Sequence, residues 1–205
     1  MEYDFYYNSI IKLDKLTNIV SVLKDYQNLH YFDAFSIEQL ISKSWLIDSL
    51  KKHLSDQIDI IVINGGWIGS LSLLINSNIN VGKIINVDID ESTKEVAEKL
   101  LKNYGNFTHI TQDMLEYEYT ELPTVIINTS CEHISQENLK IYCDRLPNDS
   151  LLIFQSNDFY GVDDHINCVN SLDEFKNQLQ GINIIEEQEL NVCGKYNRYM
   201  IIARK

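Results

Sequence analysis

The chain has 205 residues, of which 44% are hydrophobic and 23% are charged, and its formal net charge at pH 7 is −13. This length and composition predict one globular α/β domain with an N-terminal extension, and the acidic balance disfavours duplex nucleic acid as a substrate, because that binding depends on Lys and Arg at phosphates. No apolar run reaches the roughly 20 residues that a membrane span needs, and the acidic, aromatic residues 1–4 are unlike a signal peptide, so we expect a cytoplasmic protein.

The four cysteines are scattered along the chain and include no C-x-x-C pair. Their spacing predicts neither a zinc-binding motif nor a disulfide framework, so structural thiols and no metal site are expected. They are Cys131, Cys143, Cys168 and Cys193.

Residues 1–35 form an aromatic N-terminal extension. Apolar residues from Ile10 to Leu23 recur at helical spacing, which predicts one helix with aromatic flanks. The extension either caps a substrate mouth or pads the edge of a sheet. Its aromatic residues are Tyr3, Phe5, Tyr6, Tyr7, Tyr26, Tyr31, Phe32 and Phe35.

A second helix is expected over residues 36–53. Ser36 is suited to the N-cap, and Gln39 stands three residues later, where it would complete a capping box.

The central stretch, residues 59–91, contains the most informative motif of the chain. An apolar strand over 60–63 breaks into a glycine-containing turn over 64–69, restarts as a helix over 70–76, and is followed by a strand over 83–87. Such a turn presents free backbone N–H groups at a helix N-terminus, and Asp88 at the tip of the next strand can accept both hydroxyls of a ribose. These residues predict a site for a nucleoside, and the alternative is a tight turn without a ligand.

The rest of the chain alternates helices and strands. Helices are expected over residues 91–104, with Gly105 as a C-cap, and over 135–146 and 172–179. Strands are expected over residues 107–111, 125–127, 151–154, 182–190 and 196–203.

Two polar strand ends supply candidates for chemistry. The loop after residue 127 contains Glu132 and His133, and a histidine with a pKa near 6.5 could remove a proton from an acceptor. With Ile134 these residues form a Glu-His-hydrophobic triplet, and the alternative, which the family resemblance given below implies, is that the triplet caps the following helix and only orders the pocket. The loop after residue 154 contributes Gln155, Asn157 and His165, which either bind a polar substrate or satisfy backbone groups of the loop.

Residues 65–69 together with 87–90 resemble the first two motifs of the class I S-adenosylmethionine-dependent methyltransferases. In that family an acid precedes three glycines at alternate positions; here Ile63 stands in place of the acid and Trp67 in place of the middle glycine. The resemblance covers about residues 37–205. It implies a Rossmann-like, seven-stranded, mostly parallel sheet with an antiparallel C-terminal hairpin and helices on both faces, so residues 36–205 would form the methyltransferase-like domain.

The resemblance also implies S-adenosyl-L-methionine as the cofactor. Asp88 would bind the ribose, Asp113 and the backbone of Met114 the adenine, and Lys43 either meets the methionine carboxylate or is solvated. Arg198 is either a surface ion-pair partner or an anchor for an acidic substrate. The residues expected at the cofactor are Asn64, Gly65, Gly66, Trp67, Gly69, Asp88, Ile89, Asp113, Met114 and Asn128.

The function implied is methyl transfer to a small polar molecule or a protein side chain, with Glu132 and His133 as catalytic candidates. Residues 128–131 lack the Pro-Pro-aromatic motif of amino-methylating enzymes, and no cysteine has the Pro-Cys setting of cytosine methylation, so nucleic acid is disfavoured again. The alternatives are another transfer or cleavage of the same cofactor, an inactive binding or scaffold protein, and a nicotinamide-linked dehydrogenase. The incomplete G-x-G-x-x-G and the final antiparallel pair oppose the last.

Overall fold

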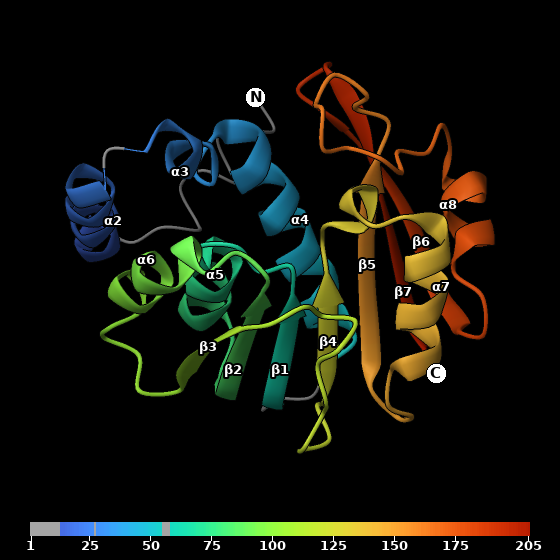
Figure 1. Cartoon of the computed structure of the whole chain (residues 1–205), viewed down its shortest axis with the longest axis horizontal. Helices are drawn as coiled ribbons and strands as arrows, with labels where there is room; N and C mark the ends of the chain where they lie inside the picture. Colours follow the sequence, from blue (N-terminus) through green and yellow to red (C-terminus); the bar gives the residue numbers. More distant parts are fainter. Residues whose placement is uncertain (1–12, 27, 55–57) are drawn as a thin grey trace.

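The computed structural model of the chain describes residues 13–26, 28–54 and 58–205, and its centre is a seven-stranded sheet (Figure 1). The strands lie in the order β3-β2-β1-β4-β5-β7-β6, and six run in one direction while β7 runs antiparallel to β5 and β6. This confirms the predicted sheet and its C-terminal hairpin. The strands are β1 Ile58–Asn64, β2 Val81–Asp88, β3 Phe107–Thr111, β4 Val125–Asn128, β5 Leu151–Asn157, β6 Asn183–Val192 and β7 Tyr196–Arg204.

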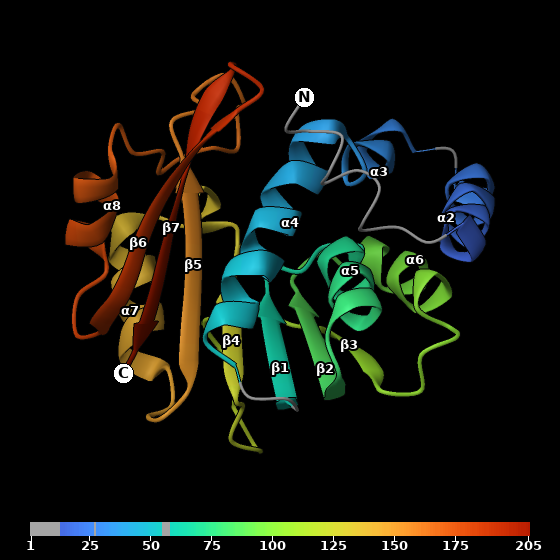
Figure 2. The same ribbon diagram turned by 180° about the vertical axis from the view of Figure 1, so that it is seen from behind.

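Helices cover both faces of the sheet. On one face, α4 and α5 pack through residues such as Leu50 and Leu74 onto Ile61 of β1 (Figure 2). On the other face, α7 and α8 cover β4, β5 and β7. Strands covered on both sides read as continuous apolar runs, which is why β1 and β5 were visible in the sequence. The helices are α2 Leu13–Tyr26, α3 Leu29–Asp33, α4 Ile37–Lys52, α5 Ser70–Asn78, α6 Ser92–Leu100, α7 Gln136–Arg145 and α8 Leu172–Gln178, with a 3-10 turn, η1, at Cys131–His133.

A loop rather than a helix covers the second face of β1 and β2. Residues 112–124 cross these strands, and Tyr117 is buried against Val62, Ile85 and Val87 (Figure 1). The strand order reverses between β1 and β4. Sheets of this kind bind ligands at the carboxyl ends of the strands beside such a reversal, and the helices and the loop cover the faces of the sheet rather than this edge.

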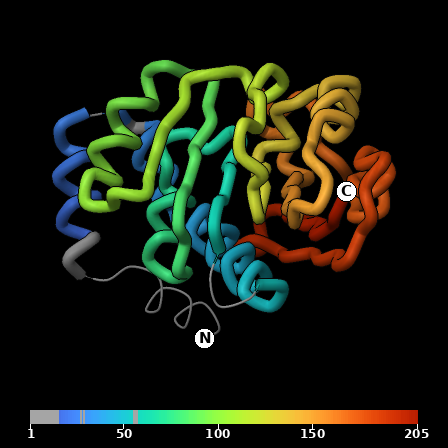
Figure 3. The backbone as a smooth tube through the Cα atoms, turned by 90° about the horizontal axis from the view of Figure 1, so that it is seen from below, coloured from blue at the N-terminus to red at the C-terminus, as the bar shows by residue number. Residues whose placement is uncertain are grey.

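The N-terminal extension differs from its prediction. The described part holds two helices, because the Asn28 side chain accepts the His30 N–H at 3.0 Å and starts α3 as a separate helix. α2 packs on α6 through Ile19, Val22 and Leu23, at the opposite end of the molecule from the β6–β7 hairpin (Figure 3). The aromatic residues Tyr3, Phe5, Tyr6 and Tyr7, and Ile10, lie outside the described residues.

Several element ends also differ. Ser36 is the N-cap of α4, as predicted, but the reciprocal half of the capping box is replaced, because the Ser36 N–H donates to Asp33 O and Gln39 accepts from Lys43. α6 ends at Leu100, and its C-cap is Leu101 rather than Gly105, because the next residues form a turn closed by the Tyr104 N–H on Leu101 O. Among the described residues, every helix is too short or too polar to cross a membrane.

Candidate functional site

The glycine-containing turn after β1 is held tightly against the end of β2. Gly65, Trp67 and Gly69 have φ angles of 65°, 48° and 77°, the left-handed region that glycine tolerates best. The Gly66 N–H donates to Val87 O at 3.1 Å, and a Cβ on Gly66 would lie 2.0 Å from Oδ1 of the buried Asn86. The turn therefore requires glycine at position 66 and brings its backbone beside the tip of β2.

Asp88 closes this corner. Its Oδ2 accepts the Trp67 N–H at 2.6 Å and its Oδ1 accepts the Asp90 N–H at 3.0 Å. An ionised carboxylate offers about four acceptor positions, so roughly two remain for a ligand. The side chain is 9% exposed and lines the cavity described below, which fits it to two vicinal hydroxyls.

The indole of Trp67 leaves this corner open. Its ring packs edge-on against Tyr31 of α3, with centroids 6.2 Å apart, beside the apolar cluster formed by α2, α3 and α6. Trp67 thus forms part of the cavity wall and joins the turn to the N-terminal helices.

A large cavity runs along the carboxyl edge of the parallel strands. Its volume is about 1270 Å³, above the roughly 300–1,000 Å³ of a pocket for one drug-sized ligand. It can therefore hold a nucleoside cofactor together with a second molecule. The predicted site residues that line it are Gly65, Gly66, Trp67, Asp88, Ile89, Asp113, Met114, Glu132, His133, Asn157 and His165.

The tip of β3 forms one end of the cavity. Asp113 Oδ1 accepts the Leu115 N–H at 2.8 Å, which fixes the loop that carries Met114. Met114 lies over Gly65: its Cε would be 3.7 Å from a Cβ placed there, and its sulfur accepts from Asn128 Nδ2 at 3.3 Å. Asp113 and Met114 therefore line the cavity together with Gly65 and Asp88.

Four predicted site residues lie outside the cavity lining, because the interior uses their polar groups. Asn64 is fully buried and donates to the hydroxyls of Tyr119 and Tyr142. Gly69 is the N-cap of α5, and Asn128 accepts the Ser130 N–H. β5 extends further than predicted, so Gln155 is a strand residue that accepts from Ser42 and Arg198.

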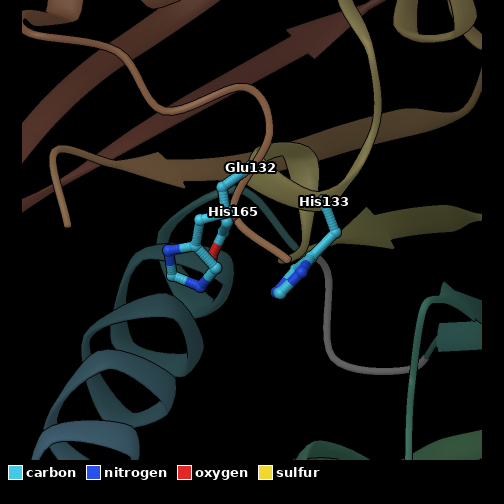
Figure 4. A group of neighbouring side chains, drawn as sticks. All are labelled: Glu132, His133 and His165. Atoms are coloured by element: carbon cyan, nitrogen blue, oxygen red, sulfur yellow. The ribbon is translucent and has the colours of Figure 1, made fainter. Parts of the chain in front are cut away.

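The other end of the cavity is lined by polar side chains from η1, β5 and the loop after it. Glu132 is 3% exposed, and its Oε1 accepts from Asn157 Nδ2 at 2.6 Å and lies 3.5 Å from Arg198 Nη2. The rings of His133 and His165 meet edge-on with centroids 4.7 Å apart (Figure 4). Ser135, rather than the Glu-His triplet, caps α7.

Two buried cations of this region were misjudged from sequence. Lys43 is 7% exposed, so the expectation of a solvated lysine is wrong; burial, and next the repulsion of Arg198, lower its pKa to about 7. Arg198 is 5% exposed and donates to Thr129 O at 2.5 Å, so it is not a surface ion-pair partner. No local sequence signal marks either position. Helix α4 is buried on several sides, and successive residues of β7 do not alternate between buried and exposed, so the polar residues of these elements do not identify a solvent-facing side.

The α3 region supplies further residues to the cavity. Asn28, His30, Tyr31 and Asp33 line the cavity above the glycine turn. The N-terminal extension therefore contributes to the cavity wall, where the sequence had left both a cap and edge padding open.

No family model and no curated protein matches the sequence. Among solved structures, the chain is similar to the N-methyltransferase NodS from Bradyrhizobium japonicum WM9 in complex with S-adenosyl-L-homocysteine, with a TM-score of 0.67, 10% identity, and coverage of 92% of this chain and 98% of that one. An S-adenosylmethionine-dependent methyltransferase from Clostridium acetobutylicum ATCC 824 gives a TM-score of 0.63 and 14% identity over 86% of this chain and 99% of that one. Geranyl diphosphate methyltransferase, in complex with GPP and sinefungin, gives a TM-score of 0.63 and 12% identity over 81% of this chain and 77% of that one. The chain therefore has the fold of the class I S-adenosylmethionine-dependent methyltransferases.

Proposed function

We propose that this chain is an S-adenosylmethionine-dependent methyltransferase that acts on a small polar molecule. The observation that carries the proposal is the corner formed by the glycine turn and Asp88, which opens on a cavity large enough for two ligands. The fold shared with proteins whose structures contain S-adenosylhomocysteine, S-adenosylmethionine or sinefungin supports it.

The residues at the carboxyl ends of β1, β2 and β3, which we call the β1–β3 end of the cavity, suit the cofactor. In this proposal the backbone at Gly65, Gly66 and Trp67 faces the methionine and ribose side, and the remaining acceptor positions of Asp88 take the ribose hydroxyls. Ile89 supplies an apolar surface beside the adenine, which Asp113 and Met114 bind from the other side. Asn64, Gly69 and Asn128 hold this framework rather than touch the ligand.

The residues at and after the carboxyl ends of β4 and β5, which we call the β4–β5 end of the cavity, suit the acceptor. His133 Nδ1 lies 3.1 Å from the carbonyl oxygen of Asp164, and since a carbonyl only accepts, Nδ1 carries a proton, which puts the lone pair of the neutral ring at Nε2. Nε2 can then remove a proton from an acceptor as a general base, with Glu132 beside it and with Asn157 and His165 as binding groups. Gln155 acts on the site only through Arg198.

The charge of the cavity favours a neutral or cationic acceptor over an anionic one. Eight carboxylates line it, and only three Lys or Arg side chains do. The carboxylates are Asp33, Glu38, Asp88, Asp90, Asp113, Glu132, Asp163 and Asp164, and the cations are Lys43, Lys195 and Arg198.

The chemistry asks little of the side chains. The bound cofactor supplies an electrophilic methyl group, and the protein's contribution is to align the nucleophile and to exclude water, which can provide much of the acceleration. This requirement fits a cavity in which His133 is a candidate base and many other groups can orient the acceptor.

Incubation of the chain with S-adenosylmethionine labelled in its methyl group, together with fractionated small metabolites, tests the proposal. We expect the label to appear in a small-molecule product with formation of S-adenosylhomocysteine, as detected by mass spectrometry. Transfer or release of the aminocarboxypropyl chain would instead indicate another reaction of the cofactor. Absence of turnover with intact cofactor binding would indicate a binding protein.

A further inference from the structure

Three side chains at the acceptor end of the cavity form a cluster that methyl transfer by itself does not require. Glu132 and His133 come from η1, and His165 comes from the loop after β5 (Figure 4). One donor atom from each of the three residues lies within 4.8 Å of the others. Two imidazoles and one carboxylate that converge in this way make a donor set typical of transition-metal sites.

Both imidazoles are oriented by main-chain carbonyls. His133 Nδ1 lies 3.1 Å from Asp164 O, and His165 Nδ1 lies 2.7 Å from Phe159 O. Each Nδ1 must donate its proton to a carbonyl, so each neutral ring has its lone pair at Nε2. This arrangement, in which a backbone carbonyl fixes the tautomer of a ligand, is the common outer shell of metal-binding histidines. Asp164 adds its carboxylate 3.3 Å from His133 Nδ1.

Glu132 supplies an independent observation. Its Oε1 is engaged by Asn157 and Arg198, but its Oε2 is buried and has no hydrogen-bond partner among the described residues. A buried acceptor without a partner is costly. The residue lines the cavity beside the two histidines, and a cation bound there would satisfy the unpaired oxygen.

We propose that Glu132, His133 and His165 bind one divalent transition-metal ion of the Zn²⁺ class. Donor atoms about 2.1 Å from a tetrahedral ion stand roughly 3.4 Å apart, so binding requires the three side chains to draw together by small rotations. His133 can do so, because its side chain is 37% exposed. Three protein ligands leave at least one position open toward the cavity, as in catalytic rather than structural sites.

The site goes beyond the proposed methyl transfer and does not depend on it. An ion at this place would use the lone pair of His133, so His133 would act as a ligand and not as a base. The open position would then take water or an oxygen of the acceptor, lower the pKa of that group, and allow its proton to leave to solvent.

Titration of the untagged chain with Co²⁺, followed by its visible absorption and by competition with Zn²⁺, tests the proposal. We expect one ion per chain. His165→Gln and Glu132→Gln should each weaken binding by at least about 100-fold, more than the 10–100-fold typical of losing an outer partner. His53→Gln is the matched control, because His53 pairs with Glu186 outside the cavity and should bind Co²⁺ like the wild type.

Absence of stoichiometric Co²⁺ binding to the wild type, or equal binding by the wild type and the ligand variants, would overturn the site. If Glu132→Gln does not fold, His133→Gln and His165→Gln decide the question, since both residues are at least partly exposed. Binding of S-adenosylhomocysteine to the wild type, measured separately without metal, reports on the proposed function. The two proposals can therefore fail independently.

Discussion

The two ends of the cavity are built in different ways. At the tips of β1, β2 and β3, the cavity is lined by the residues of one glycine-containing turn, whose Gly66 and Trp67 N–H groups are held by β2, and by carboxylates at or shortly after strand ends, such as Asp88. At the tips of β4 and β5, the groups are side chains from α4, η1, β5, the loop after it and β7. The first end is determined by local sequence, and the second exists only once distant segments have packed together.

The difference also appears in buried charge. The β4–β5 end contains Lys43, Glu132 and Arg198, all at most 7% exposed. Buried charges are costly unless they are paired. Removal of a single charge at this end should therefore change the free energy of unfolding strongly. The β1–β3 end should respond mainly in ligand affinity.

The largest effect is expected at Arg198. Arg198→Met removes the cation beside Glu132 and leaves the carboxylate buried with only Asn157 as a partner, so the free energy of unfolding should fall by about 3–5 kcal/mol. Urea denaturation measures this change. The control Arg204→Met, at the exposed end of the same strand, should stay within about 0.5 kcal/mol of the wild type.

A second variant separates loss of the ion pair from loss of packing. Adding Glu132→Met to Arg198→Met removes both charges and should recover most of the lost stability. If the double variant is as unstable as the single one, the charge interpretation of this end is wrong.

Lys43 should show the opposite sign. Burial lowers its pKa from an ordinary value of 10.5 to about 7, so folding releases its proton between pH 7 and pH 10.5, and below pH 7 the folded chain carries the full cost of the buried charge. Lys43→Met should therefore raise the free energy of unfolding at pH 6 by about 3 kcal/mol. Lys51→Met, on the exposed side of the same helix, is the matched control.

The pH dependence identifies the cause. The stability advantage of Lys43→Met over the wild type should shrink as the pH rises from 7 toward 10.5, because the free energy needed to remove the proton from the lysine on folding falls with each pH unit. An advantage that stays constant from pH 6 to pH 10 would point to better packing of the methionine instead.

Much of the fold could be predicted because its signals are local. All seven strands were predicted, several of them as apolar runs such as residues 60–63 and 151–154, and Ser36 was predicted as an N-cap from its residue type and position. The ends were less predictable: β5 continues through polar residues to Asn157, and α6 stops before Gly105, since burial and turn hydrogen bonds set those limits.

The candidate site divides along the same line. Gly65, Gly66 and Asp88 line the cavity as the spacing indicated, because a strand, a turn and the tip of the next strand are neighbours in any sheet of this order. Arg198 and Lys43 could not be placed from sequence, because their surroundings come from distant segments: Arg198 contacts Gln155, 43 residues away, and Lys43 lies near Arg198 itself.

The most direct test of the account is a calorimetric titration of the chain with S-adenosylhomocysteine, repeated for Asp88→Ala. We expect one ligand per chain in the wild type and an affinity at least about tenfold weaker in Asp88→Ala, the loss of roughly 1.4 kcal/mol of hydrogen bonding to the ribose. Asp59→Ala, at the amino end of β1, is the matched control and should bind like the wild type. No binding by the wild type at millimolar ligand, or unchanged affinity in Asp88→Ala, would contradict the account.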